Sequence, residues 1–462
     1  MRNLIVLLIL GLFLQGCSTL GFRSDINVPD FDEETLDNGM KIVFAEDKRL
    51  PLVNLTMMVA PGASADPIGK SGLGYFTVKL IDKGAGKMSA EKIADAFAAH
   101  GTGFSGRISH DYMIFSTESL TRSAGDILPL FHTVITEPKY TVKETRLFKK
   151  RTLASIKQSY DDPGSFADRV FAQQMMGPHP YGRQLTGSIR DVKGITIGQI
   201  KNHYQTHLRP ENATLIVSGD VSDEFKETVM KTFSNWNVPL PGVSASQPSL
   251  SLKPDNRELL LVHRNDLKQS QVRIGQMGIK RSDPDYWALQ VANIALGGNF
   301  SSRLMKEMRV KRGLTYGVRS SFSAGVYPGP FEVSSATPNE KVGESVTVAM
   351  DVLNEFRKKG MEKEELKRAK NFLKGHLIRA FENPSDVVAA IVRMRLYGLS
   401  KDEITDVVGK VDSVSLSDVN EVIERRFTPD KMRIMIYGPK KSVVEQLRPV
   451  GALEVKSYKE FL

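Results

Sequence analysis

Two stretches of the chain share the same order of residue types: Leu208-Arg-Pro-Glu-Asn-Ala-Thr-Leu-Ile-Val217 and Phe427-Thr-Pro-Asp-Lys-Met-Arg-Ile-Met-Ile436. Each predicts the end of a helix, a turn that contains a proline, and then an apolar strand. Pro429 follows Pro210 by 219 residues. A fixed spacing between matching elements is typical of an internal duplication, which predicts further matches at the same distance.

Two further pairs have this spacing. Tyr160-Asp-Asp-Pro163 and Phe381-Glu-Asn-Pro384 each follow an amphipathic, lysine-rich stretch, and their prolines lie 221 residues apart. The strand predicted at residues 52–59 has its counterpart at residues 271–278, with a similar offset. Three matches in the same order indicate a tandem duplication of a unit of roughly 220 residues.

The duplication defines the predicted domains. Residues 31–238 form an N-terminal domain and residues 255–462 a C-terminal domain. Residues 239–254 between them are rich in Pro, Ser and Gly without periodicity, which predicts a linker. A leader at residues 1–17 and a tether at residues 18–30 precede both domains.

Each unit begins with strands, continues with helices and returns to a strand. In the first unit, strands are predicted at 41–45, 52–60, 112–117 and 214–219, and helices at 71–82, 90–100, 127–136 and 143–159. Because strands and helices do not alternate strictly, the predicted fold class is α+β, with a sheet covered by helices. Two such α/β lobes, joined by a linker, are expected to form a clamshell around a cleft.

Composition narrows the possible classes of protein. The chain has 462 residues, of which 41% are hydrophobic and 25% charged, and this suits a folded globular protein rather than a disordered or polytopic membrane protein. A single cysteine excludes an internal disulfide and a multi-cysteine zinc site. The net charge of +10 comes from interleaved charges, as in residues 357–368, which favours a solvated helix face over nucleic-acid binding. A mild positive field favours acidic peptides or an anionic surface without proving either.

The first residues predict a targeting signal. Residues 4–14 form an apolar run too short for a permanent transmembrane helix. Leu14-Gln-Gly-Cys17 follows and resembles the lipobox of bacterial lipoproteins, although Gln15 is larger than the usual residue. The resemblance implies lipidation of Cys17, and Ser18 resembles the signal for sorting to the outer membrane, so the folded part is expected in the periplasm. The alternative is a plain secretory signal with an incidental cysteine.

The predicted helix at 71–82 has one apolar face. This face carries Leu73, Phe76, Thr77, Leu80 and Ile81, and the opposite face carries Tyr75, Val78, Lys79 and Asp82. Around this helix the sequence resembles the pitrilysin/insulinase family of zinc metallopeptidases from about residue 30 onward. The resemblance lies in the stretches Thr35-Leu-Asp-Asn-Gly-Met-Lys-Ile-Val43, Leu50-Pro-Leu-Val-Asn-Leu-Thr-Met-Met-Val-Ala-Pro-Gly-Ala-Ser64, Gly69-Lys-Ser-Gly-Leu-Gly-Tyr-Phe76 and His179-Pro-Tyr-Gly182, in the strand at 212–220 and in the duplication.

In active members of that family this helix contains His-x-x-Glu-His, two zinc ligands and a general base. The matching positions here are Tyr75, Val78 and Lys79, and the family's third ligand falls on Ala154 or Ser155. None of these side chains replaces a ligand or the base. The resemblance therefore implies a degenerate zinc motif, no metal bound by this chain and no catalytic residue of its own.

Other catalytic motifs are poorly supported. Of eight histidines, only His203 and His207 have i, i+4 spacing, and without a carboxylate between them they are expected to be surface or capping residues. There is no Gly-x-Ser-x-Gly nucleophile elbow. Residues 297–303 contain two glycines but lack the Gly-Lys-Ser/Thr of a phosphate loop, so they are expected to form the turn that opens the next helix.

A second group of residues lies in the C-terminal unit. The sequence predicts a helix that ends at Gly313 and a strand that starts at Leu314, with Arg309 in the last helical turn and Tyr316 early in the strand. Spacing alone favours the interpretation that Arg309 is a solvated cation and Tyr316 an ordinary aromatic residue of a strand. The family resemblance implies a different role, in which this Arg and Tyr bind the substrate backbone and stabilise the oxyanion opposite the zinc.

Some bacterial members of the family are two-chain peptidases, in which one chain has the zinc motif and the other the Arg/Tyr pair. The resemblance implies that this chain is the non-catalytic, substrate-binding subunit of a periplasmic heteromeric zinc metallopeptidase. Its partners would be a zinc-bearing subunit of the same family, peptide substrates, and the membrane through Cys17. The alternatives are a membrane-anchored structural or chaperone-like scaffold and a lone hydrolase with new chemistry.

Overall fold

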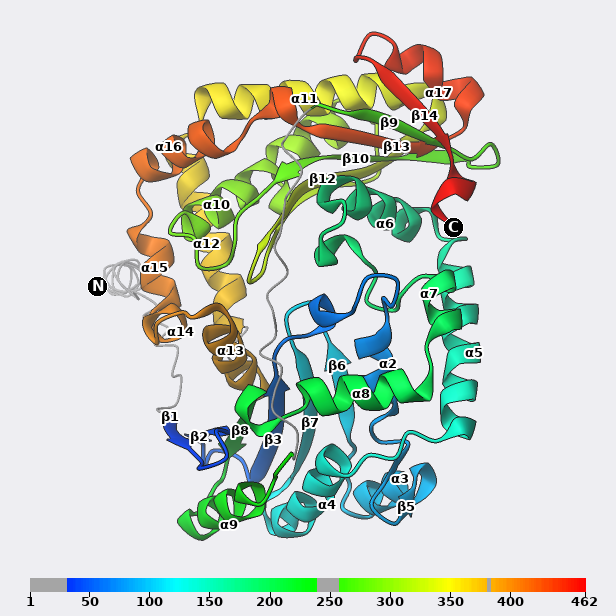
Figure 1. The fold of residues 1–462 in the computed structure, drawn as a ribbon. Helices are drawn as coiled ribbons and strands as arrows, with labels where there is room; N and C mark the ends of the chain where they lie inside the picture. The colour runs from blue at the N-terminus through cyan, green and yellow to red at the C-terminus, as the bar shows by residue number, and fades with distance from the viewer. Residues whose placement is uncertain (1–30, 239–256, 380–383) are drawn as a thin grey trace, which may run out of the picture.

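The computed structural model describes residues 31–238, 257–379 and 384–462, which form two six-stranded sheets covered by helices (Figure 1). This architecture confirms the predicted fold class of two α/β lobes. The predicted leader, Cys17 and the tether lie outside the described residues, as does the linker at 239–254. No described helix is both long and apolar enough to cross a membrane.

The two sheets repeat one pattern of strand pairing. In the N-terminal sheet, β3 is antiparallel to both of its neighbours, and β2 runs parallel to β8. In the C-terminal sheet, β10 is antiparallel to both of its neighbours, and β9 runs parallel to β13. The sheets differ at one outer strand, because β1 is antiparallel to β2 whereas β14 is parallel to β9. The duplication predicted from the sequence is therefore present in the topology.

The strand orders are β1-β2-β8-β3-β7-β6 and β11-β12-β10-β13-β9-β14. The N-terminal strands are β1 (Phe31–Thr35), β2 (Lys41–Glu46), β3 (Leu52–Val59), β6 (Ser105–Ile108), β7 (Met113–Leu120) and β8 (Ala213–Gly219), with β4 (Gly84–Ala85) and β5 (Met88–Ser89) as a separate small pair. The C-terminal strands are β9 (Leu259–His263), β10 (Gln269–Met277), β11 (Val318–Ala324), β12 (Pro328–Pro338), β13 (Arg433–Gly438) and β14 (Leu453–Ser457).

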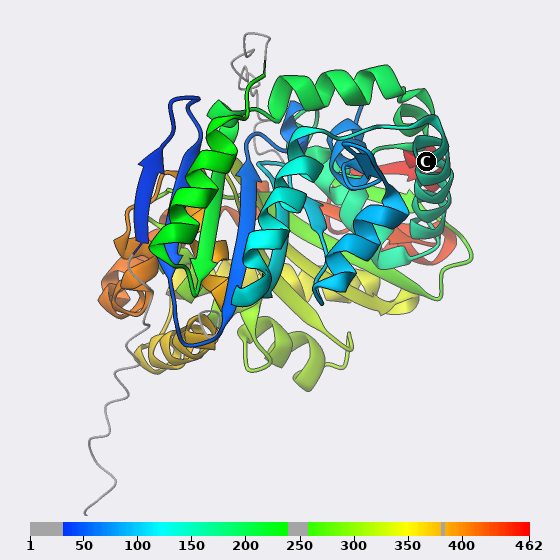
Figure 2. The same ribbon diagram turned by 90° about the horizontal axis from the view of Figure 1, so that it is seen from below.

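The helices cover both sheets. Those of the first unit are α2 (Leu73–Leu80), α3 (Ala90–Ala99), α4 (Ala124–Thr136), α5 (Val142–Ser159), α6 (Pro163–Met176), α7 (Ile189–Gly194), α8 (Ile197–His207) and α9 (Asp223–Ser234). Those of the second unit are α10 (Tyr286–Asn293), the π-helical segments η5 (Ile294–Gly298) and η6 (Met305–Lys311), α11 (Val342–Lys359), α12 (Lys363–Arg379), α13 (Pro384–Tyr397), α14 (Asp402–Thr405), α15 (Val407–Ser413), α16 (Leu416–Arg426) and α17 (Lys440–Leu447). In the view from below, α3, α4 and α9 cover the outer face of the N-terminal sheet (Figure 2).

One helix of each unit packs on the sheet of the other unit. Helix α6 lies against β10, β12 and β13 of the C-terminal sheet, and α13 lies against β3 and β8 of the N-terminal sheet (Figure 1). Their first residues, Pro163 and Pro384, belong to one of the matched pairs of the duplication. The two units have therefore exchanged equivalent helices.

The exchanged helices are held by apolar packing. Phe171 of α6 is fully buried, and its ring would lie 3.0 Å from a Cβ placed on Gly275 of β10, so glycine is needed for this close approach. Ile391 of α13 is also fully buried and shares an apolar cluster with Ile216 of β8 and Met58 of β3. Each sheet thus completes its core with a helix from the other half of the chain.

A turn makes a further contact between the units. The turn between β11 and β12 reaches the N-terminal unit, where the backbone N–H of Val326 donates to Asp111 Oδ2 at 3.2 Å. The hydroxyl of Tyr181, from the His-Pro-Tyr-Gly stretch, donates to the same carboxylate and accepts from the N–H of Tyr327 at 3.3 Å. Burial and Asp111 raise the pKa of Tyr181, so its hydroxyl stays protonated as a donor.

Candidate functional site

Helix α2 carries the degenerate zinc motif, and its start is fixed by Asp66. The buried carboxylate of Asp66 accepts hydrogen bonds from the N–H groups of Gly72 and Gly74, both at 2.8 Å. Gly72 has φ of 95°, a left-handed conformation that favours glycine. A carboxylate at this position satisfies the free N–H groups of the first helical turn.

The three motif positions of α2 are engaged with neighbouring residues. The Tyr75 ring lies 5.6 Å from that of Phe148, and burial raises the pKa of Tyr75. Lys79 Nζ donates to the carbonyl oxygen of Gly106 on β6 at 2.7 Å. Val78 is 1% exposed and packs in the core. The prediction that Val78 lies on the face opposite the core was therefore wrong, because β6 covers that face of the helix.

Helix α5 contributes Phe148 and Arg151 to the lining of a pocket of about 500 Å³, which Val78 and Lys79 of α2 also line. Ala154 and Ser155, where the third ligand was expected, are exposed. The ammonium of Lys79 and the guanidinium of Arg151 would repel a divalent cation. Within the described residues, no three His, Cys, Asp or Glu side chains lie together as a metal site requires.

The histidine pair has a different environment from the one expected. His203 is 3% exposed, so the prediction of surface or capping histidines was wrong for this residue. Its Nε2 lies 3.5 Å from Asp66 Oδ1, and its ring centroid lies 4.5 Å from that of His207. Burial, with a smaller contribution from His203, lowers the pKa of His207 to about 4. The pair therefore packs beneath the start of α2.

We expect the purified mature protein to contain no stoichiometric zinc. A triple variant with Tyr75→His, Val78→Glu and Lys79→His is expected to remain without peptidase activity on its own, because α5 presents Phe148 and Arg151 instead of a carboxylate. Elemental analysis of both proteins measures the metal. About one tightly held zinc per wild-type chain would contradict this prediction.

Arg309 lies between two aromatic rings. Its guanidinium carbon is 4.7 Å from the ring centroid of Tyr316 and 4.8 Å from that of Phe300, distances typical of cation–π contacts. Tyr316 is 87% exposed and Phe300 65% exposed. We call these three residues the Arg309 stack. The structure thus brings together the two residues that the sequence singled out and adds Phe300, which the sequence analysis missed.

Tyr316 lies in a loop rather than in a strand. The strand β11 begins at Val318 and not at Leu314 as predicted, because side chains hold the backbone of the loop before it. The Thr315 hydroxyl lies 2.7 Å from the carbonyl oxygen of Ala336, and it accepts from the N–H of Gly317 at 3.1 Å. The preceding helical turns are π-helical, a form that often occurs at functional sites.

A pocket of about 560 Å³ lies beside the Arg309 stack, and Phe300 lines it. It opens between the start of α6 and the C-terminal sheet, so both units contribute to its wall. The pocket near Lys79 and this pocket share no lining residue among those described. Phe300 of the Arg309 stack and the motif residues Val78 and Lys79 therefore line separate pockets of this chain.

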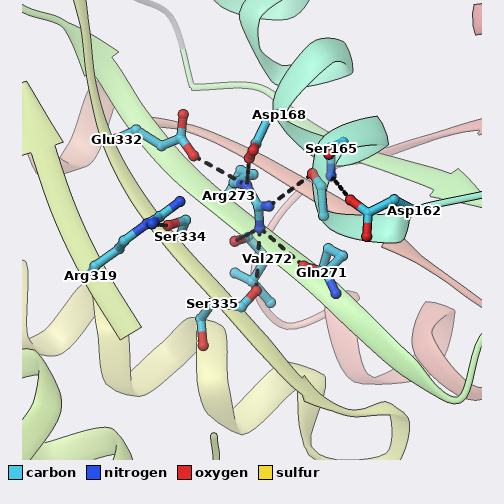
Figure 3. A network of polar contacts seen from close by, with 11 residues as sticks. Asp162, Ser165, Asp168, Gln271, Val272, Arg273, Arg319, Glu332, Ser334 and Ser335 are labelled. Carbon is cyan, nitrogen blue, oxygen red and sulfur yellow. Dashed lines mark hydrogen bonds and ion pairs between the residues drawn. The ribbon is translucent and has the colours of Figure 1, made fainter. Parts of the chain in front are cut away.

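Arg273 is the centre of a polar network at this pocket (Figure 3). It is 4% exposed, and its Nε lies 2.7 Å from Asp168 Oδ1 of α6 and 3.1 Å from Glu332 Oε1 of β12. Its Nη2 donates to the carbonyl oxygen of Gly164 at 3.2 Å. A single buried guanidinium therefore links the exchanged helix to the sheet on which it packs.

Burial raises the pKa of Glu332 from 4.5 to about 7, although the charge of Arg273 opposes the shift. The folded state then binds a proton more tightly than the unfolded state. We expect the free energy of unfolding to fall as the pH rises from 4.5 to 7, on the order of 3 kcal/mol for a shift of this size.

Glu332→Gln should remove this part of the pH dependence, which denaturant unfolding at a series of pH values would measure. The matched control is Glu344→Gln on the exposed side of α11, which should follow the wild type. If the Glu332→Gln and wild-type curves run parallel between pH 4.5 and 7, the assignment to Glu332 is wrong.

The fold is that of a two-lobed, peptidase-like protein, and comparison with known families agrees. Residues 41–188 match the model described as insulinase (peptidase family M16), and residues 194–373 match the peptidase M16 inactive domain. The chain therefore belongs to the M16 insulinase family, and the resemblance predicted from the sequence is confirmed. The second match, of the inactive type, includes Arg309 and Tyr316.

Known relatives cover most of the chain. An uncharacterized zinc protease of Streptomyces coelicolor is 25% identical over 412 residues, 88% of this chain and 89% of that protein. The non-peptidase homolog YmxG of Helicobacter pylori is 21% identical over 96% of this chain and 99% of its own. The crystal structure of a peptidase M16 inactive domain from Pseudomonas fluorescens has a TM-score of 0.81 at 27% identity, covering 89% of this chain and 98% of that one.

Proposed function

We propose that this chain is the non-catalytic, substrate-binding subunit of a periplasmic heteromeric zinc metallopeptidase that cleaves peptides. In this role Arg309 and Tyr316 act at the zinc site of the partner subunit. The observation that carries the proposal is the Arg309 stack, in which a half-buried guanidinium lies against an exposed phenol beside a pocket of about 560 Å³. In the described part of the chain, the guanidinium of Arg309 has ring contacts but no hydrogen bond or ion pair.

The chemistry of the two groups fits this role. A guanidinium and a phenol are directed donors of the kind that stabilise a developing oxyanion. Tyr75 and Lys79 stand where the family has its two zinc-binding histidines, and Val78 stands in place of the general base, so metal, water and general base must come from another chain. The name of the Helicobacter pylori relative, a non-peptidase homolog, supports the absence of activity in the isolated chain.

A second candidate function is a membrane-anchored scaffold without a proteolytic role. It is favoured by the exposure of Phe300, Val310 and Tyr316, of which Val310 is 66% exposed. Aromatic residues and arginine are enriched where proteins bind one another. In this case the Arg309 stack would bind a protein without contributing to cleavage.

Co-expression with a family member that has an intact His-x-x-Glu-His motif separates these functions. We expect the two chains to co-purify, with zinc in the partner, and to cleave peptides that neither chain cleaves alone. A complex whose activity equals that of the partner alone would favour the scaffold. Failure of every such relative to co-purify would contradict the heteromeric proposal.

We also propose that the protein is attached to a membrane through a thioether-linked lipid on Cys17, the only cysteine of the chain. Cys17→Ser is expected to release the protein into the soluble periplasmic fraction, because no other thiol is available for acylation. Cell fractionation with a high-salt wash measures this. Retention of the variant in the membrane fraction would show that another anchor exists.

A further inference from the structure

The pocket beside the Arg309 stack contains four charged side chains, and three of them already have partners. Asp162 accepts from the N–H of Ser165 at 2.7 Å and caps helix α6. Asp168 is paired with Arg273, which is also paired with Glu332. These charges therefore hold the exchanged helix in place.

Arg319 is the fourth charged side chain of the pocket. Its Nε donates to the Ser334 hydroxyl at 3.1 Å, and Figure 3 shows the two side chains side by side. In the described residues neither Nη atom of Arg319 has a hydrogen bond or an ion pair, and the residue is exposed. Of the two cations that line the pocket in the described residues, Arg319 is thus the one without an ion pair, and its guanidinium fork is a group that binds carboxylates with two parallel bonds.

The position of Arg319 relates it to the Arg309 stack. Arg319 follows Tyr316 by three residues, which corresponds to at most about 10 Å of extended chain at roughly 3.3 Å per residue. Phe300 belongs both to the stack and to the wall of the pocket. A peptide held by the stack would therefore bring a side chain to Arg319 within about three of its own residues.

We propose that the pocket is a subsite for an acidic side chain of the bound peptide, whose carboxylate pairs with Arg319. This inference rests on the proposed function, since it assumes that the Arg309 stack binds peptide. The occupant is an extended peptide with Asp or Glu about three residues from the residue at the stack. The excess of Lys and Arg over Asp and Glu, 63 against 53, also favours an acidic ligand.

The test is a position-by-position scan with labelled peptides and the full-length mature chain. One uncharged peptide sequence is made in a series in which a single Glu moves along it, with matching Gln and Lys series. Fluorescence anisotropy measures the Kd of each peptide. We expect one or two Glu positions to bind about tenfold more tightly than the matching Gln peptides, as a charge-assisted pair at a partly exposed site allows.

Variants test whether Arg319 causes the tighter binding of the Glu peptides. Arg319→Gln is expected to remove the preference for Glu while leaving the Kd of the Gln peptides unchanged, and Arg319→Lys should keep part of it. The matched control is Arg312→Gln, since Arg312 is exposed and does not line the pocket. Arg309→Ala should instead weaken every peptide of the series.

The outcomes distinguish this inference from the proposed function. If none of the peptides binds, the proposed function is contradicted. If peptides bind and Arg309→Ala weakens them, but Glu, Gln and Lys peptides bind equally, only the acidic subsite is wrong. Tighter binding of the Lys series would also overturn the inference, because Asp162 and Asp168 would then be the recognising groups. A preference for Glu that persists in Arg319→Gln would overturn it as well.

Discussion

Replacing Arg309 by alanine is expected to lower the kcat of the two-chain peptidase by about 10²–10³, the usual cost of losing one oxyanion donor. Tyr316→Phe removes only the phenol hydroxyl, and we expect a loss on the same scale. Tyr316 is exposed, and Arg309 is half-buried against two exposed rings and outside the apolar core, so neither substitution should disturb folding. The measurement is kcat and KM for the assembled complex, together with the yield of complex on co-purification.

Several comparisons make this result interpretable. Arg312→Ala changes an exposed arginine three residues further along the chain and should leave the rate unchanged. A fall in kcat with KM unchanged indicates contacts that tighten in the transition state. A fall in kcat together with a rise in KM indicates that these residues also bind the ground-state peptide. If Arg309→Ala and Tyr316→Phe both cleave at the wild-type rate within a demonstrated complex, the chain is a scaffold.

Phe171→Ala should lower the free energy of unfolding by about 3–5 kcal/mol, the usual cost of removing a buried phenylalanine. Phe171 is fully buried where α6 packs on the C-terminal sheet, and Gly275 provides no side chain to fill the space left behind. Denaturant unfolding measures the change. The matched control is Phe372→Ala on α12, which is 48% exposed and should cost much less.

The shape of the unfolding curve is part of this prediction. Because α6 and α13 each pack on the other unit, the two units should unfold in one cooperative transition, and Phe171→Ala should shift that whole transition. The coupling between the units would be contradicted if unfolding showed two separate transitions and Phe171→Ala shifted the midpoint of only the later one.

The sequence predicted the large features of the fold because they depend on local pattern. The matched prolines and strands revealed the duplication, and apolar spacing placed α2 to within two residues at each end. Strands β1 and β6 were not predicted, since both are short and largely polar. Arg309 and Tyr316 were singled out through the family resemblance, because spacing alone favoured an ordinary cation and aromatic.

Long-range contacts could not be predicted in the same way. The burial of Val78 depends on β6 crossing one face of α2, and the partners of Arg273 come from residues far apart in the chain. The exchange of α6 and α13 leaves no local signal, because each helix has an ordinary apolar face whichever sheet it meets. Phe300 had a weak signal, as a large apolar residue in a turn that follows two glycines.

The exchange of helices constrains how the protein is made. A ribosome completes α6 at Met176, but the sheet that covers it includes β13, which begins at Arg433. Throughout the synthesis between these points, the sheet surface on which α6 packs is incomplete, and the N-terminal sheet lacks its covering helix until α13 has been made. Nascent chains of this protein are therefore expected to need holding by chaperones until almost the last residue. A chain that stops before β13 leaves α6, a helix of its first half, without part of the sheet on which it packs.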